Sequence, residues 1–300
     1  MHRFRHQTLR RRLFLSGIFI AAAAAAVAVA AHQPAPTPPA ANSPTIQDPA
    51  ELKAYTDAIK TSDPTARAEA FAAFIQDYPK TIVLTDALDQ EMAAWQAAGD
   101  SSQVMKVAKR LVALDPGNIR ALGIVVSLDR VSAEKGNLDA LNEMCQDASG
   151  GMLEVPMWRQ PANVDSASYV ALSKLLNDIF TGAEGYCAVE QKNYSQAREW
   201  LGRALKLDPT NVQDNYQLGV ADLESAPPDA TGFWYCARAI DLAQSAAIPQ
   251  DSASMVAYCK GKFAKYHGAD DGWDDLVKSA ATEEAPPADF AAGIKPAAAK

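Results

Sequence analysis

Four cysteines are the residues of this 300-residue chain whose chemistry is easiest to anticipate: Cys145, Cys187, Cys236 and Cys259. In an oxidising compartment an even number of cysteines favours disulfides, and four cysteines allow three pairings. If a helical hairpin turns near Ala247, Cys236 lies 11 residues before the turn and Cys259 lies 12 residues after it. Antiparallel helices would then bring these two cysteines level. We therefore favour a Cys236–Cys259 disulfide over the other pairs, with unpaired buried thiols as the alternative.

Residues 258–275 are the second place where side chains suggest chemistry. They contain His267 and four aspartates, Asp270, Asp271, Asp274 and Asp275. A single imidazole without cysteines or carboxylates at ligand spacing is a poor metal site, and these aspartates do not follow the EF-hand pattern. A protonated histidine in the last turn of a helix is favoured by the helix dipole. We predict that no metal is bound, and we keep an envelope enzyme or metal-binding protein using this region as the alternative function.

Catalytic motifs are not found in the sequence. There is no nucleophile elbow, P-loop or HExxH pattern. The sequence therefore predicts no catalytic residues, no cofactor and no enzyme activity.

Small and apolar residues recur from residue 178 to residue 224 in the order of a helical hairpin repeat. The first unit carries Gly185, Ala197, Leu201, Ala204 and Pro209, and the next carries Val212, Asn215, Leu218 and Gly219. An Asp-Pro-x-Asn turn occurs twice, at 115–118 and at 208–211. This spacing resembles the tetratricopeptide repeat (TPR) family, whose period is about 34 residues. Segments 233–239, 265–268 and 271–274 are similar to exported bacterial members of that family.

The resemblance implies an all-α fold, a TPR-like α-solenoid of helical hairpins over residues 48–281. It also implies that the first helices of the hairpins line a concave groove for a protein or peptide partner. The residues at groove positions are Arg120, Ser127, Arg130, Tyr186, Val189, Glu190, Gln213, Tyr216, Val220 and Glu224. For the tyrosines, packing between repeats is the competing interpretation, and an ordinary helical bundle is the competing fold. The Lys/Asn set that clamps a terminal carboxylate in some TPR domains is not reproduced.

Turn signals divide the rest of the chain into hairpins. Asp48-Pro49 and Asp63-Pro64 are N-caps followed by proline, and they predict a first hairpin at about 48–79. A second hairpin is expected at about 81–115, with its turn at Gly99-Asp100. A third begins at Ile119 and turns at Gly136-Asn137.

The repeat is interrupted by an insertion before residue 178. We expect a loop at about 148–164, because this stretch contains Gly150, Gly151, Pro156 and Pro161. A strand at 152–155 is disfavoured, because Pro156 cannot donate to a ladder. One long helix is expected at about 166–191.

The C-terminal part is predicted to hold a helix at 232–243 and another that starts with Asp251 as N-cap and ends at Gly268. A short helix from Gly272 should cap the last apolar face, as terminal repeat units must. Residues 282–300, rich in proline and alanine, are expected to form a disordered tail.

The N-terminus has the pattern of an export signal. Residues 1–31 combine five arginines with an apolar run, and Ala28 and Ala30 suit a signal peptidase. Arg11-Arg12-Leu13-Phe14-Leu15 resembles the twin-arginine motif, with the general export route as the alternative. Residues 32–47 are expected to form a Pro/Ala-rich linker. We predict a periplasmic or secreted protein, or an inner-membrane protein if the apolar run is not cleaved.

The net charge of the chain indicates which kinds of partner it is suited to bind. The chain has 28 basic and 36 acidic residues; residues 32–300 keep 23 basic and all 36 acidic ones, a formal charge of −13. Such acidity argues against nucleic acid and against anionic lipid, and it favours basic partners. The sequence does not indicate which protein is bound, in which pathway, or in what oligomeric state.

Overall fold

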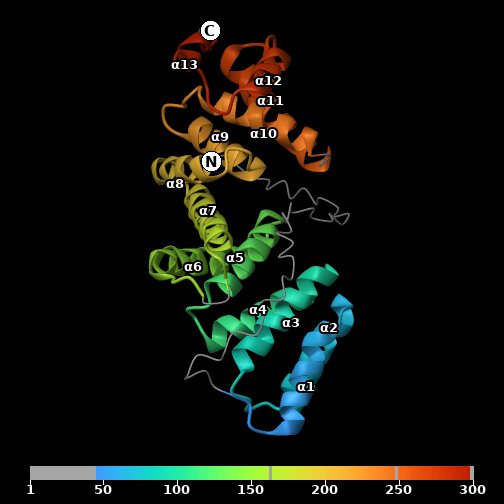
Figure 1. The fold of residues 1–300 in the computed structure, drawn as a ribbon. Coiled ribbons are helices and arrows are strands. Elements are labelled where there is room, and N and C mark those ends of the chain that lie inside the picture. The colour runs from blue at the N-terminus through green and yellow to red at the C-terminus, as the bar shows by residue number, and fades with distance from the viewer. Residues whose placement is uncertain (1–44, 162–163, 247–248, 298–300) are drawn as a thin grey trace, which may run out of the picture. The chain divides into compact units, whose positions relative to one another are not determined.

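The computed structural model describes residues 45–161, 164–246 and 249–297. In these residues the chain forms thirteen α-helices, one short 3-10 helix and no β-strand, which confirms the all-α fold class (Figure 1). The predicted export signal and residues 32–44 of the predicted linker lie outside the described residues. None of the described helices combines the length and the apolar character needed to cross a membrane.

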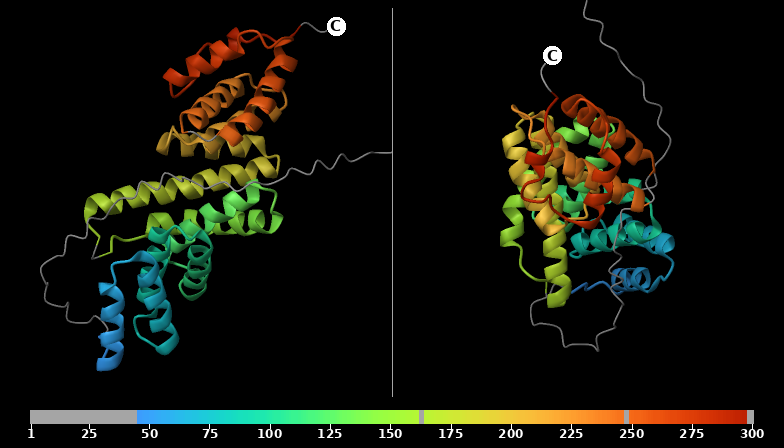
Figure 2. Two further views of the ribbon diagram at one scale, coloured as in Figure 1. Left: turned by 90° about the vertical axis from the view of Figure 1, so that its right-hand side faces the viewer. Right: turned by 90° about the horizontal axis from the view of Figure 1, so that it is seen from above.

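The bounds of the helices follow the predicted turn signals closely. The helices are α1 (Pro49–Lys60), α2 (Pro64–Asp77), α3 (Leu84–Ala98), α4 (Ser101–Leu114), α5 (Ile119–Glu134), α6 (Leu138–Glu154), η1 (Val155–Met157), α7 (Ser166–Glu190), α8 (Tyr194–Leu207), α9 (Val212–Glu224), α10 (Gly232–Ser245), α11 (Pro249–His267), α12 (Trp273–Thr282) and α13 (Phe290–Gly293). From α1 to α11, helices that follow each other along the chain pack against each other, as in stacked helical hairpins, and α12 packs on α10 (Figure 2).

Side-chain caps explain why the first two helices begin where they do. The Asp48 carboxylate accepts a hydrogen bond from the Ala50 N–H at 2.8 Å, and the Asp63 carboxylate accepts one from the Ala66 N–H at 2.8 Å. Each aspartate is followed by a proline, whose fixed φ suits the first helical position. These helix starts were predicted from the same residues.

Glycine allows the closest contacts between helices. A Cβ at Gly185 of α7 would lie 2.5 Å from Cγ of Leu201 in α8. A Cβ at Gly219 of α9 would lie 2.9 Å from the carbonyl oxygen of Gly232 and 3.0 Å from the Cys236 nitrogen in α10. The prediction that these two glycines mark tight helix contacts is confirmed.

The predicted loop at 148–164 is wrong over its first part. Helix α6 continues to Glu154 and passes directly into η1. Gly151, one of the predicted loop residues, is a packing residue, because a Cβ there would lie 2.5 Å from the ring of Phe180 in α7. The predicted long helix is present as α7, which runs beside both α5 and α6 (Figure 2).

The C-terminal end differs from the expectation in two places. Helix α11 begins at Pro249, so Asp251 lies inside the helix and is not its N-cap. The chain is also packed beyond residue 282, where we expected disorder. The Phe290 ring of α13 lies 5.2 Å from the Trp234 ring, and the Ala297 N–H donates to the Tyr266 carbonyl at 2.7 Å. Aromatic burial therefore holds part of this alanine-rich tail against α10 and α11.

Candidate functional site

The candidate site is the face formed by α5, α7 and α9, the first helices of three consecutive hairpins. Helix α7 contacts both α5 and α9, so side chains from three repeats meet along it. This is the surface to which the TPR resemblance assigned a groove.

Arg130 lies at the centre of this face. Its Nη2 is 2.8 Å from Oδ1 of Asp214 in α9, and its Nε is 3.1 Å from Oε1 of Glu134 in α5. The guanidinium carbon is 5.7 Å from the centre of the Tyr186 ring of α7. Asp214 is fully buried. Arg130 therefore ties α5 to α9, and its charge is used within the molecule.

Gly182 makes this connection sterically possible. A Cβ at this position of α7 would lie 2.6 and 2.9 Å from the two carboxylate oxygens of Asp214, and 3.0 Å from Nη1 of Arg130. Any larger residue would displace the ion pair, since real Cβ contacts are not that short.

Asp178 lies one helical turn before Gly182 and is also buried. Burial first, and then the negative charge of Asp214, raise the pKa of Asp178 to about 7. Oδ1 of Asp178 and Oδ2 of Asp214 are buried without a hydrogen-bond partner. Asp178 thus adds a second buried carboxylate near the Arg130–Asp214 ion pair without pairing with the guanidinium itself.

The sequence prediction missed Asp178, Gly182 and Asp214 as members of this site. Asp178 and Gly182 are four residues apart, which places them on one helical face. That spacing was the available signal. It does not specify that Asp214, 32 residues farther along the chain than Gly182, would complete the set.

Four other predicted groove residues lie on α5 and at the end of α7. Arg120 pairs with Asp89 of α3 at 3.0 Å, and the Ser127 hydroxyl donates to the Gly123 carbonyl of its own helix at 2.8 Å. Glu190 is exposed, whereas its neighbour Val189 is buried. Of these residues, Glu190 is best placed to meet a partner.

The predicted groove residues on α9 are partly covered by α11. The Tyr216 ring lies 6.0 Å from the ring of Tyr258. Glu224 accepts a hydrogen bond from the Tyr258 hydroxyl at 2.6 Å and pairs with Lys262 Nζ at 2.6 Å. Gln213 and Val220 are half-buried. Tyr216 and Glu224 therefore connect repeats, and Gln213 remains partly open to solvent.

Residues 258–275 are engaged in contacts within the molecule. Nδ1 of His267, in the last turn of α11, lies 3.0 Å from the Lys295 carbonyl oxygen. Lys260 lies 3.2 Å from Asp270 and 3.7 Å from Asp274. Across the described ranges, no three His, Cys, Asp or Glu side chains are grouped so that they could hold a metal.

The four cysteines form two disulfides in the structure. Cys236 of α10 pairs with Cys259 of α11, and Cys145 of α6 pairs with Cys187 of α7. The favoured sequence pairing was the first of these. The second bridges the insertion, whose geometry the sequence did not specify.

Comparison with known proteins adds little to this geometry. No protein-family model matches the chain, and no curated protein matches it. Among solved structures, the chain is similar to a protein described as "PilW, widely conserved type IV pilus biogenesis factor", with 12% sequence identity and a TM-score of 0.39. The match covers 77% of this chain and 99% of that chain. At this similarity it does not identify a shared function.

Proposed function

We propose that this chain is an exported helical-repeat scaffold that binds a protein or peptide partner along α5, α7 and α9. The observation that carries the proposal is the Arg130–Asp214 ion pair at 2.8 Å, which joins the first and third of these helices across Gly182 of the second. A face held in this way is pre-organised, which lowers the entropy lost when a partner binds.

The accessible part of this face favours a basic partner segment. Glu190 is exposed at the end of α7, and Gln213 is partly exposed in the first turn of α9. The residues that follow the predicted signal carry a formal charge of −13, from 23 basic and 36 acidic residues. Complementary charge mainly speeds association and selects among partners.

Export is supported by the cysteines as well as by the N-terminal pattern. All four cysteines are paired, and disulfides persist in oxidising compartments such as the periplasm. If the signal is cleaved, the protein isolated from native envelopes should start after Ala30 or Ala31 by mass spectrometry. An intact N-terminus would instead indicate the membrane-anchored alternative.

Affinity capture with variants that add positive charge tests the binding face. Glu190→Lys and Gln213→Lys are expected to reduce recovery of the partner from native envelope fractions at least about tenfold, equivalent to about 1.4 kcal/mol. Recovery should also fall as salt increases, because exposed charges are screened.

Glu199→Lys is the matched control. Glu199 is an exposed residue of α8, and within the described chain its salt bridge is to Arg203 of the same helix. It should leave recovery unchanged. Equal loss in all three variants would indicate a non-specific charge effect, and unchanged recovery in the first two would remove this face from the proposal. Arg130→Ala is a poor probe, because it leaves the buried Asp214 unpaired and disturbs the fold.

A further inference from the structure

The C-terminal segment, residues 286–297, lies on the surface of α10 and α11 as a bound peptide would. Phe290 and Ile294 are its large apolar side chains, and both are partly buried against the apolar cluster that contains Trp234. The Phe290 and Trp234 rings meet edge to face, with 5.2 Å between their centres. Residues 291–293 are exposed. An aromatic residue and an aliphatic residue four positions later therefore anchor this segment.

Two hydrogen bonds join the backbone of this segment to the end of α11. The Ala297 N–H donates to the Tyr266 carbonyl at 2.7 Å. This carbonyl belongs to the last turn of α11, where carbonyls have no partner within the helix. Nδ1 of His267 lies 3.0 Å from the Lys295 carbonyl oxygen, which can only accept, so this nitrogen donates. Both bonds use backbone groups of the segment, and other peptides carry the same groups.

The C-terminal segment does not satisfy this surface completely. Trp234 is only 2% exposed, yet its Nε1 has no hydrogen-bond partner in the described chain. A buried donor without an acceptor is unfavourable. Residues 283–285 and 287–289, which lead from α12 to Phe290, are exposed. A competing peptide that brought an acceptor to Trp234 Nε1 would therefore have an advantage over the segment.

We propose that this surface of α10 and α11 is a peptide-binding site, which the C-terminal segment occupies when no partner is bound. The partner is a peptide segment with an aromatic residue and, four positions later, an aliphatic residue. Its aromatic side chain packs on Trp234, and one of its N–H groups bonds to the Tyr266 carbonyl. The C-terminal segment is a built-in competitor, since a segment of the same chain acts at a high effective concentration. None of these residues lies on α5, α7 or α9, so either binding proposal can fail without the other.

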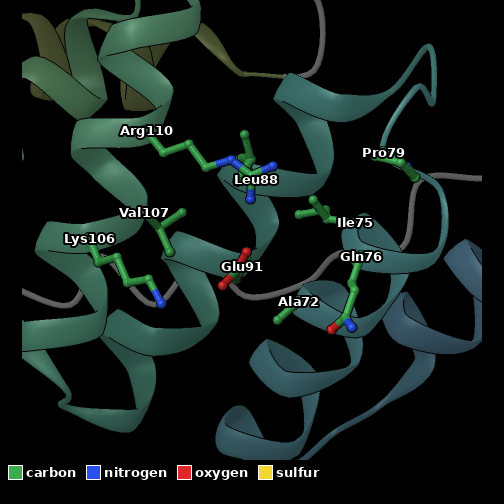
Figure 3. A pocket seen from close by; sticks show the side chains of 9 residues that line it. All are labelled: Ala72, Ile75, Gln76, Pro79, Leu88, Glu91, Lys106, Val107 and Arg110. Atoms are coloured by element: carbon green, nitrogen blue, oxygen red, sulfur yellow. The ribbon is translucent and has the colours of Figure 1, made fainter.

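The pocket between α2, α3 and α4 offers a ligand much less surface (Figure 3). Its apolar residues Ile75, Leu88 and Val107 are almost fully buried. Lys106 and Arg110 are exposed, and their positive charges act on the Glu91 carboxylate. The charges there are therefore matched within the molecule. On α10 and α11, in contrast, the C-terminal segment itself shows what kind of ligand fits.

Fluorescence anisotropy with a labelled synthetic peptide of residues 286–297 tests the proposal on the full chain. In the Phe290→Ala/Ile294→Ala variant the protein's own segment loses both anchors. This variant should bind the peptide saturably and at least about tenfold more tightly than the unmodified protein does. The matched control is Ala291→Ser/Ala292→Ser, at exposed positions of the same segment. It should bind the peptide as weakly as the unmodified protein.

Altered peptides test the spacing of the anchors. A peptide with serine at positions 291–293 keeps both anchors and should bind the double-alanine variant within about threefold of the original peptide. A peptide in which the isoleucine is moved by one position should bind at least about tenfold more weakly. A peptide with alanine at both anchors should not bind.

Three results would overturn the proposal. They are no saturable binding of the peptide by the double-alanine variant, equal affinity of that variant and the unmodified protein, and equal binding of the peptides with correct and shifted spacing. A dimer of the unmodified protein that disappears in the variant would also overturn it, because the surface would then take the segment of a second copy. Circular dichroism checks that the variant is folded. If it is not, the single Phe290→Ala variant serves the same comparison.

Discussion

Arg130 and Asp178 show how single residues set the properties of the candidate site. Arg130 is mostly buried and holds Asp214, while Asp178 adds a second buried carboxylate close to the same pair. A buried ion pair contributes little net stability but costs several kcal/mol when one partner is removed. The second carboxylate is destabilising when ionised, because its Oδ1 has no hydrogen-bond partner.

Protonation of Asp178 should make the stability of the protein depend on pH. Its pKa is about 7 when folded, against about 3.9 in an unfolded chain. The stability that this group contributes is therefore fully present below about pH 4 and is lost as pH rises through 7, a change of up to about 4 kcal/mol. Asp178→Asn should flatten the fall in unfolding free energy between pH 5 and 8, measured by urea denaturation.

The control for this measurement is Asp77→Asn, which changes an exposed aspartate at the end of α2. Its pH profile should run parallel to that of the unmodified protein. Asp222, whose pKa is also raised to about 7 by burial and by Asp229, contributes equally in every variant and cancels in the comparison. A parallel profile for Asp178→Asn would show that Asp178 does not titrate in this range.

At the scale of elements, helix packing determines the structure of the insertion between hairpins. Helix α6 does not stop at its two glycines, because Gly151 receives the Phe180 ring of α7 and the bare backbone allows this contact. The Cys145–Cys187 disulfide fixes the same pair of helices. A glycine that would weaken an isolated helix by about 1 kcal/mol is retained where it permits a close contact.

Gly150 and Gly151 form a matched pair for testing this packing. Gly150→Ala should stabilise the protein by up to about 1 kcal/mol, since nothing lies within 4 Å of its Cβ position and alanine favours the helix. Gly151→Ala should destabilise it by about 1–3 kcal/mol, because its Cβ would overlap the Phe180 ring. Both free energies come from chemical denaturation. If both substitutions raised the unfolding free energy, or both lowered it, α6 would not pack on Phe180.

At the scale of the whole molecule, residues 45–297 are held by contacts between neighbouring hairpins, with two disulfides added. The buried apolar residues form several clusters along the chain rather than one central core. This distribution is typical of repeat proteins, in which each unit is stabilised mainly by its neighbours. Each disulfide should therefore stabilise mainly the two adjacent helices that it joins.

Removing either disulfide should lower the unfolding free energy by about 3–4 kcal/mol in the chain-entropy estimate. The estimate uses sequence separations of 42 residues for Cys145–Cys187 and 23 residues for Cys236–Cys259. The two Cys→Ser double variants and the reduced protein can be compared by urea denaturation. Alkylation of the denatured, unreduced protein should label no cysteine. Labelling of two or four cysteines under these conditions would show that the pairing is incomplete.

Local chemistry in the sequence determined the helices and many of their junctions. Asp48 and Asp63, each followed by proline, set two helix starts, because capping depends only on adjacent residues. Gly185 and Gly219 marked tight helix contacts, because the repeat pattern places small residues there. The length of α7 followed from uninterrupted helical spacing.

Only the tertiary structure decided which distant residues meet. It brought Arg130, Asp178 and Asp214 together from three helices. It also showed that Gly151, which the sequence places in a loop, lies in a helix and packs against another helix. Such contacts depend on the relative placement of whole helices. Their burial and charge therefore cannot be obtained from the spacing within any one segment.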